Sequence, residues 1–93
     1  MDVWIETAAG NLFRASHTDR IAVIQKSTES WDVSIGAGAA SAVFAPGIDD
    51  EANAKRIRSS LAMGLHNAAA QPKPQVLAYC GTTTSVTLND LAG

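Results

Sequence analysis

Residues 31–56 read WDVSIGAGAASAVFAPGIDDEANAKR, and they contain the change from strands to the one long helix that the sequence predicts. Trp31, Val33 and Ile35 alternate with polar residues at positions 32 and 34. This period of two residues is typical of an antiparallel strand with one buried face. A further strand is expected over residues 41–45 (SAVFA), ended by the pair Pro46-Gly47.

The glycine-rich segment GAGAAS at 36–41 allows two interpretations. The pattern Gly36-x-Gly38-x-x-Ser41 comes one residue short of the G-x-G-x-x-G fingerprint of dinucleotide-binding loops. That fingerprint needs a helix to begin at the loop, because the phosphates bind the free N–H groups of the first helical turn. Here a strand-like run and Pro46 come first, so we expect a six-residue hairpin connection. A ligand-binding loop built on Gly36, Gly38 and Ser41 is the alternative.

A helix is predicted over residues 49–70. Asp49 or Asp50 can cap its first turn, and the acidic start DDE suits the positive end of the helix dipole. Its apolar residues recur every three or four positions and form one stripe: Ala54, Ile57, Leu61, Leu65 and Ala68. Gly64 lies on this stripe, where it allows a close approach of another backbone. We expect the stripe to pack on the Trp31, Val33 and Ile35 face.

The flanking sequence adds shorter strands on both sides. VWIE (3–6), LFRA (12–15) and RIAVIQ (20–25) precede the central stretch, and the last two either form separate strands or one bulged arm. VLAYC (76–80) and SVTL (85–88) follow the helix as a strand or hairpin. The segregation of strands and helix predicts an α+β fold in a single domain (1–93), with an antiparallel meander over 3–45, four to six strands in all, and one long amphipathic helix on one face.

The bulk composition excludes several classes of protein. The chain has 93 residues, a formal charge of −2 and one cysteine, which allows no internal disulfide and no multi-cysteine zinc site. The charge argues against nucleic acid as a partner, although Lys55, Arg56 and Arg58 could form a local basic patch. The longest uncharged run is interrupted by Pro46 and is too short to span a membrane. The start MDVWIETAAG has no signal-peptide pattern, so we expect a cytoplasmic protein.

Few side chains carry a chemical signal. His17 stands two residues before Asp19 and could act with it as a general base, but this composition is also typical of a polar turn. Cys80 falls on a strand, where lone cysteines mostly behave as small apolar residues. The acids at 49–51 are explained by helix capping. We therefore predict no catalytic residue, no metal site, no cofactor and no enzymatic activity.

Trp4 gives the one sequence hint of a partner. It lies between Val3 and Ile5 and should point to the opposite face of its strand. With Phe13 and Ile24 it would form an apolar patch for protein contact, or else a small second core. We accordingly predict a non-enzymatic interaction or regulatory module that acts through a sheet face or edge, as a homodimer or with another protein. The alternative is a module that senses a small ligand or nucleotide through the 36–41 loop.

The chain also resembles a class of short uncharacterised proteins of actinobacteria and their phages. The resemblance rests on WIET…GNLFRASH…RIAVI followed by WDVSI…VFAPGIDDEANAKRIRSSL, and it covers residues 3–65. Ile48 departs from the pattern, which has an aromatic residue after the glycine. The class implies a β-meander followed by a helix, and it implies no activity.

Overall fold

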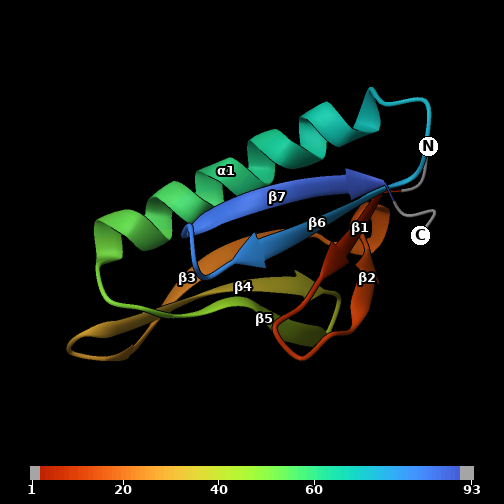
Figure 1. Cartoon of the computed structure of the whole chain (residues 1–93). Helices are drawn as coiled ribbons and strands as arrows, with labels where there is room; N and C mark the ends of the chain where they lie inside the picture. Colours follow the sequence, from red (N-terminus) through yellow and green to blue (C-terminus); the bar gives the residue numbers. More distant parts are fainter. Residues whose placement is uncertain (1–2, 91–93) are drawn as a thin grey trace.

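The structure is a computed structural model that describes residues 3–90, and within this range the chain forms two β-sheets and one long helix (Figure 1). Sheet A has the order β2-β1-β6-β7, with strands β1 (Val3–Glu6), β2 (Leu12–Arg14), β6 (Gln75–Cys80) and β7 (Ser85–Asp90). Sheet B has the order β3-β4-β5, with strands β3 (Arg20–Ser27), β4 (Ser30–Ala37) and β5 (Ala40–Ile48). The helix α1 (Glu51–Ala69) joins β5 to β6. The predicted α+β class is confirmed.

The strand arrangement differs from the expected single meander. The described residues contain seven strands in two sheets, and β1 pairs with β6 in parallel. The split occurs after β2, where a 3-10 turn, η1 (Ala15–His17), separates β2 from β3. The N–H of Asp19 then donates to the carbonyl of Gly36 at 2.8 Å, which places β3 beside β4. Residues 12–25 are therefore two strands of different sheets, and not one bulged arm.

Helix α1 begins and ends close to the predicted positions. The Asp50 carboxylate accepts a hydrogen bond from the N–H of Ala52 at 2.8 Å and caps the first turn. Four members of the predicted apolar stripe are buried, and Leu65 is half-buried against the same core. Within residues 3–90, no helix has both the length and the apolar character needed to cross a lipid bilayer.

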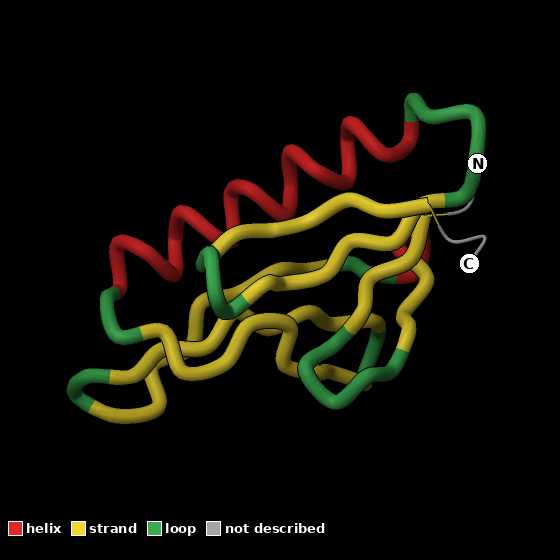
Figure 2. The backbone as a smooth tube through the Cα atoms, viewed as in Figure 1, coloured by secondary structure: helices red, strands yellow, loops and turns green. Residues whose placement is uncertain are grey.

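The core lies between the helix and both sheets. Figure 2 shows the helix running along the strands, and α1 contacts β7 of sheet A as well as β3 and β4 of sheet B. The largest fully buried side chains come from both sheets and the helix: Ile5, Val33, Ile35, Phe44, Ile57, Leu61 and Leu77. Val33 and Ile35 belong to the same cluster as the helix stripe, as the sequence predicts, and Trp31 packs on its margin.

Gly64 makes the close approach of the helix to sheet A possible. A Cβ atom at this position would collide with Cδ2 of Leu77 and would lie 3.9 Å from Cγ1 of Val86. Leu77 is fully buried and has little space to move away. The close neighbours of Gly64 are thus the side chains of Leu77 and Val86, and not another backbone as the sequence predicts.

Strand β4 is buried on both faces, although its alternation predicts one polar, solvent-facing side. Asp32 and Ser34 are each less than a tenth exposed, and both make hydrogen bonds to β5. Asp32 accepts from the N–H of Gly47 at 3.1 Å, at an irregularity where β5 continues past Pro46. The positive φ of Gly47 (65°) lets the strand run on to Ile48, so Pro46-Gly47 does not end it.

Candidate functional site

The glycine-rich segment forms a tight hairpin rather than a six-residue loop. Gly36 pairs with Ser41 and Ala37 pairs with Ala40, which leaves only Gly38 and Ala39 in the turn. Gly38 has a φ of 62°, a conformation that glycine adopts without strain. The expected hairpin is confirmed, and its expected length is wrong because the strands extend further than the residue types indicate.

An aspartate and an arginine from the start of β3 hold this hairpin in place. The Asp19 carboxylate accepts from Arg20 Nη1 at 3.1 Å and from the N–H of Gly38 at 3.2 Å. Arg20 Nη2 donates to the Gly38 carbonyl at 3.1 Å. The guanidinium lies over Gly36, where a Cβ would stand 2.6 Å from Nε. Gly36 therefore makes room for Arg20, and both the N–H and the carbonyl of Gly38 form hydrogen bonds inside the protein.

The predicted apolar patch of Trp4, Phe13 and Ile24 does not form. Phe13 is the cross-strand partner of Ile5, so it faces the core, whereas Trp4 points to the other face of sheet A. Ile24 lies on β3 of sheet B, opposite Asp32 and 42% exposed. The prediction fails because it placed all three residues in one sheet.

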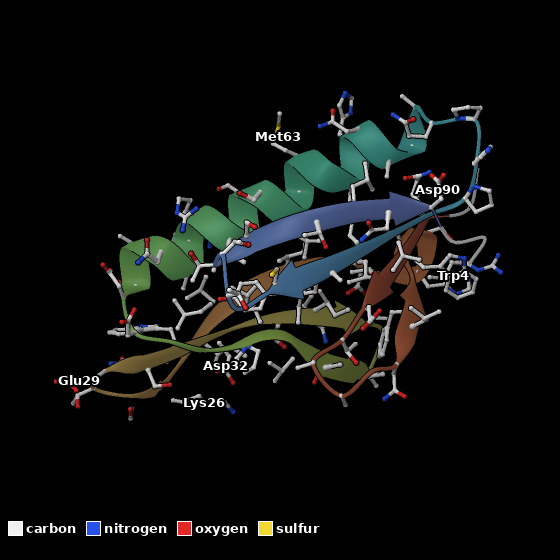
Figure 3. All side chains as sticks on the ribbon, in the orientation of Figure 1. Trp4, Lys26, Glu29, Asp32, Met63 and Asp90 are labelled. Atoms are coloured by element: carbon white, nitrogen blue, oxygen red, sulfur yellow. The ribbon has the colours of Figure 1, made fainter. Side chains whose placement is uncertain are left out.

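Trp4 instead packs with the neighbouring strand. The guanidinium of Arg14, its cross-strand partner, lies 5.0 Å from the centre of the indole ring, within the range of a cation–π contact. The indole Nε1 is buried and has no hydrogen-bond partner among residues 3–90. Figure 3 places Trp4 at the same end of the molecule as Asp90.

The candidate chemical groups lie apart from one another. Asp19 directs its carboxylate to Arg20 and Gly38, and not to the exposed His17. Within residues 3–90, no three or more His, Cys, Asp or Glu side chains are close enough to hold a metal ion. Cys80 ends β6 and is half-buried. Hydrogen bonds from the side chain and backbone of Thr83, and from Thr82, lower the pKa of its thiol below the ordinary value, because they stabilise the thiolate.

Two grooves flank the helix, and each has arginine among its lining residues. The first, between α1 and β7, encloses about 460 Å³ and has Met63, Gly64, Val86 and Leu88 among its lining residues. Met63 is 62% exposed and projects from the outside of α1 (Figure 3), and Leu88 is 38% exposed. Because β7 is the last strand of sheet A, this groove runs beside an unpaired strand edge.

The second groove lies between α1 and the start of β3. It encloses about 420 Å³, and Arg20 and Arg58 both line it. Arg56 lines the first groove. Lys55 Nζ lies 4.0 Å from Oε1 of Glu51, one helical turn earlier. Lys55, Arg56 and Arg58 therefore lie in three different surroundings and do not form one basic patch.

Met63 and Leu88, which line the groove beside β7, are not among the site residues predicted from the sequence. Met63 is the one large apolar residue of α1 that lies off the core stripe and is mostly exposed, and Leu88 ends the apolar part of β7. The helical periodicity alone places Met63 off the apolar stripe, and this could have indicated an exposed apolar contact residue. The placement of Arg58 beside Arg20 depends on the pairing of β3, which no local pattern indicates.

No family model, no characterised protein and no solved structure matches this chain. The resemblance to short actinobacterial and phage proteins therefore stays a prediction.

Proposed function

We propose that the chain is a non-enzymatic interaction module that binds a second copy of itself through the free edge of β7. The observation that supports this most is an unpaired edge strand beside a groove whose lining includes Met63, Val86 and Leu88. Soluble proteins usually protect such edges with charges, prolines or bulges. The middle of β7, Val86-Thr87-Leu88, carries none of these.

The sequence of β7 is complementary to itself in one antiparallel register. Pairing centred on Thr87 sets Val86 opposite Leu88 of the partner subunit, and Ser85 opposite Asn89 of the partner subunit. Directly opposed residues share a face of the sheet, so the two apolar side chains of each copy meet. If the pairing is centred on Val86 or Leu88 instead, one of these two residues lies opposite the end of the partner strand. If it is centred between two residues, the apolar side chains of the two copies lie on opposite faces of the joined sheet.

The charges at the ends of β7 also fit this register. It brings Asp90 opposite Thr84 of the partner subunit. Arg56 Nη2 donates to the Thr84 carbonyl within each chain, at 3.4 Å. Each Asp90 carboxylate would thus approach an arginine of the other copy, on both sides of the two-fold axis. Asp90 already accepts from Gln75 Nε2 at 2.6 Å, which fixes its position.

The helix enlarges the contact beyond a single pair of strands. A two-fold axis perpendicular to the joined sheet keeps both α1 helices on the same face. Met63 and the groove lining would then be covered along with the β7 edge. Stable interfaces bury about 1,200–2,000 Å² in total, so this additional helix surface is needed for a stable dimer.

The mass of the protein in solution tests the proposal. Light scattering over a range of concentrations should give twice the 9.7 kDa of one chain. Leu88→Lys places a charge at the centre of the contact and should give the mass of one chain. The matched control is Ile24→Lys, since Ile24 is also an exposed strand residue (42% against 38%) but lies on β3, and this variant should keep the doubled mass. A single-chain mass for the wild type at high concentration, or a dimer that survives Leu88→Lys, would contradict the proposal.

Two further aspects belong to the same proposal. We place the protein in the cytoplasm, on the ground that its single cysteine allows no internal disulfide. We assign its origin to actinobacteria or their phages, on the ground of the motif resemblance alone.

A further inference from the structure

The groove between α1 and β3 carries an unbalanced positive charge. Arg58 is half-buried there, and it has no hydrogen bond or ion pair with any other residue of the range 3–90. The helix positions three and four residues away are Ala54, Lys55, Leu61 and Ala62, so no acid on α1 can reach it. Asp19 also lines the groove, but both of its carboxylate oxygens are engaged, one by Arg20 Nη1 and one by the N–H of Gly38.

The second arginine of the groove is held in a fixed position. Arg20 donates to Asp19 and to the Gly38 carbonyl, and it lies against Gly36. A guanidinium has five N–H donors, so these two hydrogen bonds leave others free for a ligand. Arg20 and Asp19 together are neutral, and Arg58 therefore gives the groove a net charge of about +1.

The remaining walls combine hydroxyl groups with an apolar surface. Thr18 and Ser59 line the polar part, and Ile21, Ala62 and Leu65 line the rest. The volume of about 420 Å³ falls within the range of small-molecule sites, roughly 300–1,000 Å³, which are mostly apolar with a few fixed polar groups.

We propose that this groove binds a small organic carboxylate, with the carboxylate on Arg58 and the apolar body on Ile21, Ala62 and Leu65. Arg20 and the Ser59 hydroxyl supply further donors, whereas the Thr18 hydroxyl donates to the Arg14 carbonyl at 3.4 Å. A single negative charge matches the single excess positive charge, and this favours a carboxylate over a doubly charged phosphate. The ligand would bind on the β3 side of α1, and Ser59 is the one lining residue that this groove shares with the groove beside β7.

The test is a titration with hexanoate and phenylacetate, followed by the backbone NMR signals of Ile21, Ser59 and Ala62. Both carboxylates should shift these signals in a saturable way, and hexanol and inorganic phosphate should bind more weakly. Arg58→Gln should weaken hexanoate binding about tenfold or more, because a charged hydrogen bond is lost. Arg58→Lys, which keeps the charge but not the planar fork, should retain part of the affinity.

Arg56→Gln is the matched control, since it removes the same charge from the same helix on the other side. It should leave hexanoate binding unchanged, and unfolding curves of all variants show whether each one folds. Three results would overturn the inference: no saturable shift with either carboxylate, an equal loss of affinity in Arg56→Gln, or hexanol or phosphate binding as tightly as hexanoate.

Discussion

The two sides of helix α1 present grooves of similar size that adjoin different structures, and each groove has arginine in its lining. The β7 side has Met63, Val86 and Leu88 beside an unpaired strand edge, whereas the β3 side has Arg20 and Arg58 beside a clamped hairpin. Their volumes, about 460 and 420 Å³, do not distinguish them. Their surroundings do: the groove beside β7 adjoins an unpaired strand edge, for which we propose a protein partner, and the groove beside β3 holds two arginines, for which we propose a small anion.

The helical repeat explains how one helix serves both surfaces. Successive residues are about 100° apart around the axis, so Arg56 and Arg58 point about 160° apart. Arg56 therefore faces β7 and donates to Thr84, while Arg58 faces β3. Two arginines that look like one basic cluster in the sequence belong to different sites.

The largest expected effect comes from adding a side chain at Gly64, where α1 packs against β6. Gly64→Val would drive side-chain atoms into Leu77 and should lower the free energy of unfolding by about 1–3 kcal/mol, the usual cost of overpacking. Ala62→Val makes a similar change on the β3 side, where Ala62 is exposed, and should cost only about 0.5 kcal/mol from helix propensity. Urea unfolding of both variants at one fixed chain concentration measures the difference.

An equal loss of unfolding free energy in Gly64→Val and Ala62→Val would show that α1 packs no more tightly at Gly64 than at Ala62. A stable Gly64→Val protein would show that Leu77 has room to move. Ala62→Val also tests whether the two grooves act separately, because it should weaken carboxylate binding and leave self-association unchanged.

A smaller effect is expected at the turn that leads into β7. Thr83→Val removes the main hydrogen bond to the Cys80 thiolate and should raise the pKa of the thiol toward its ordinary value. At a pH below the ordinary thiol pKa the variant then holds less thiolate, so its alkylation by iodoacetamide should be slower than in the wild type. At a pH above both pKa values the two rates should converge.

Thr82→Val is the control for this turn, because the Thr82 side chain contributes least to lowering the pKa of Cys80. It should change the alkylation rate less than Thr83→Val does. Equal rates for the wild type and Thr83→Val across the whole pH range would show that the turn does not stabilise the thiolate.

The smallest effect is expected at the clamped hairpin on the β3 side. Asp19→Ala removes an exposed ion pair and should cost at most about 1 kcal/mol of stability. It also removes the acceptor of the Gly38 N–H, so amide exchange at Gly38 should become faster. Glu29→Ala, at the other end of β3, should leave the exchange of Gly38 unchanged, and unchanged exchange in Asp19→Ala would argue against the clamp.

Local patterns predicted the elements better than their arrangement. The helix, its Asp50 cap and the two hairpins follow from periodicity and turn residues within a few positions of one another. The separation into two sheets depends on η1 and on the parallel pairing of β1 with β6, which lie far apart in the sequence. The patch of Trp4, Phe13 and Ile24 failed for this reason, and both grooves were missed because each joins α1 to a strand distant in the chain.

The most direct measurement of the central proposal is a cross-link through residue 87. Opposed residues in antiparallel strands have Cα atoms about 4.5–5.5 Å apart, within the range that a disulfide spans. A Thr87→Cys variant in a Cys80→Ser background should therefore form a disulfide-linked dimer under mild oxidation, whereas Ile24→Cys in the same background should not. Failure of Thr87→Cys to cross-link, or equal cross-linking of both variants, would contradict the pairing of β7 with a second β7.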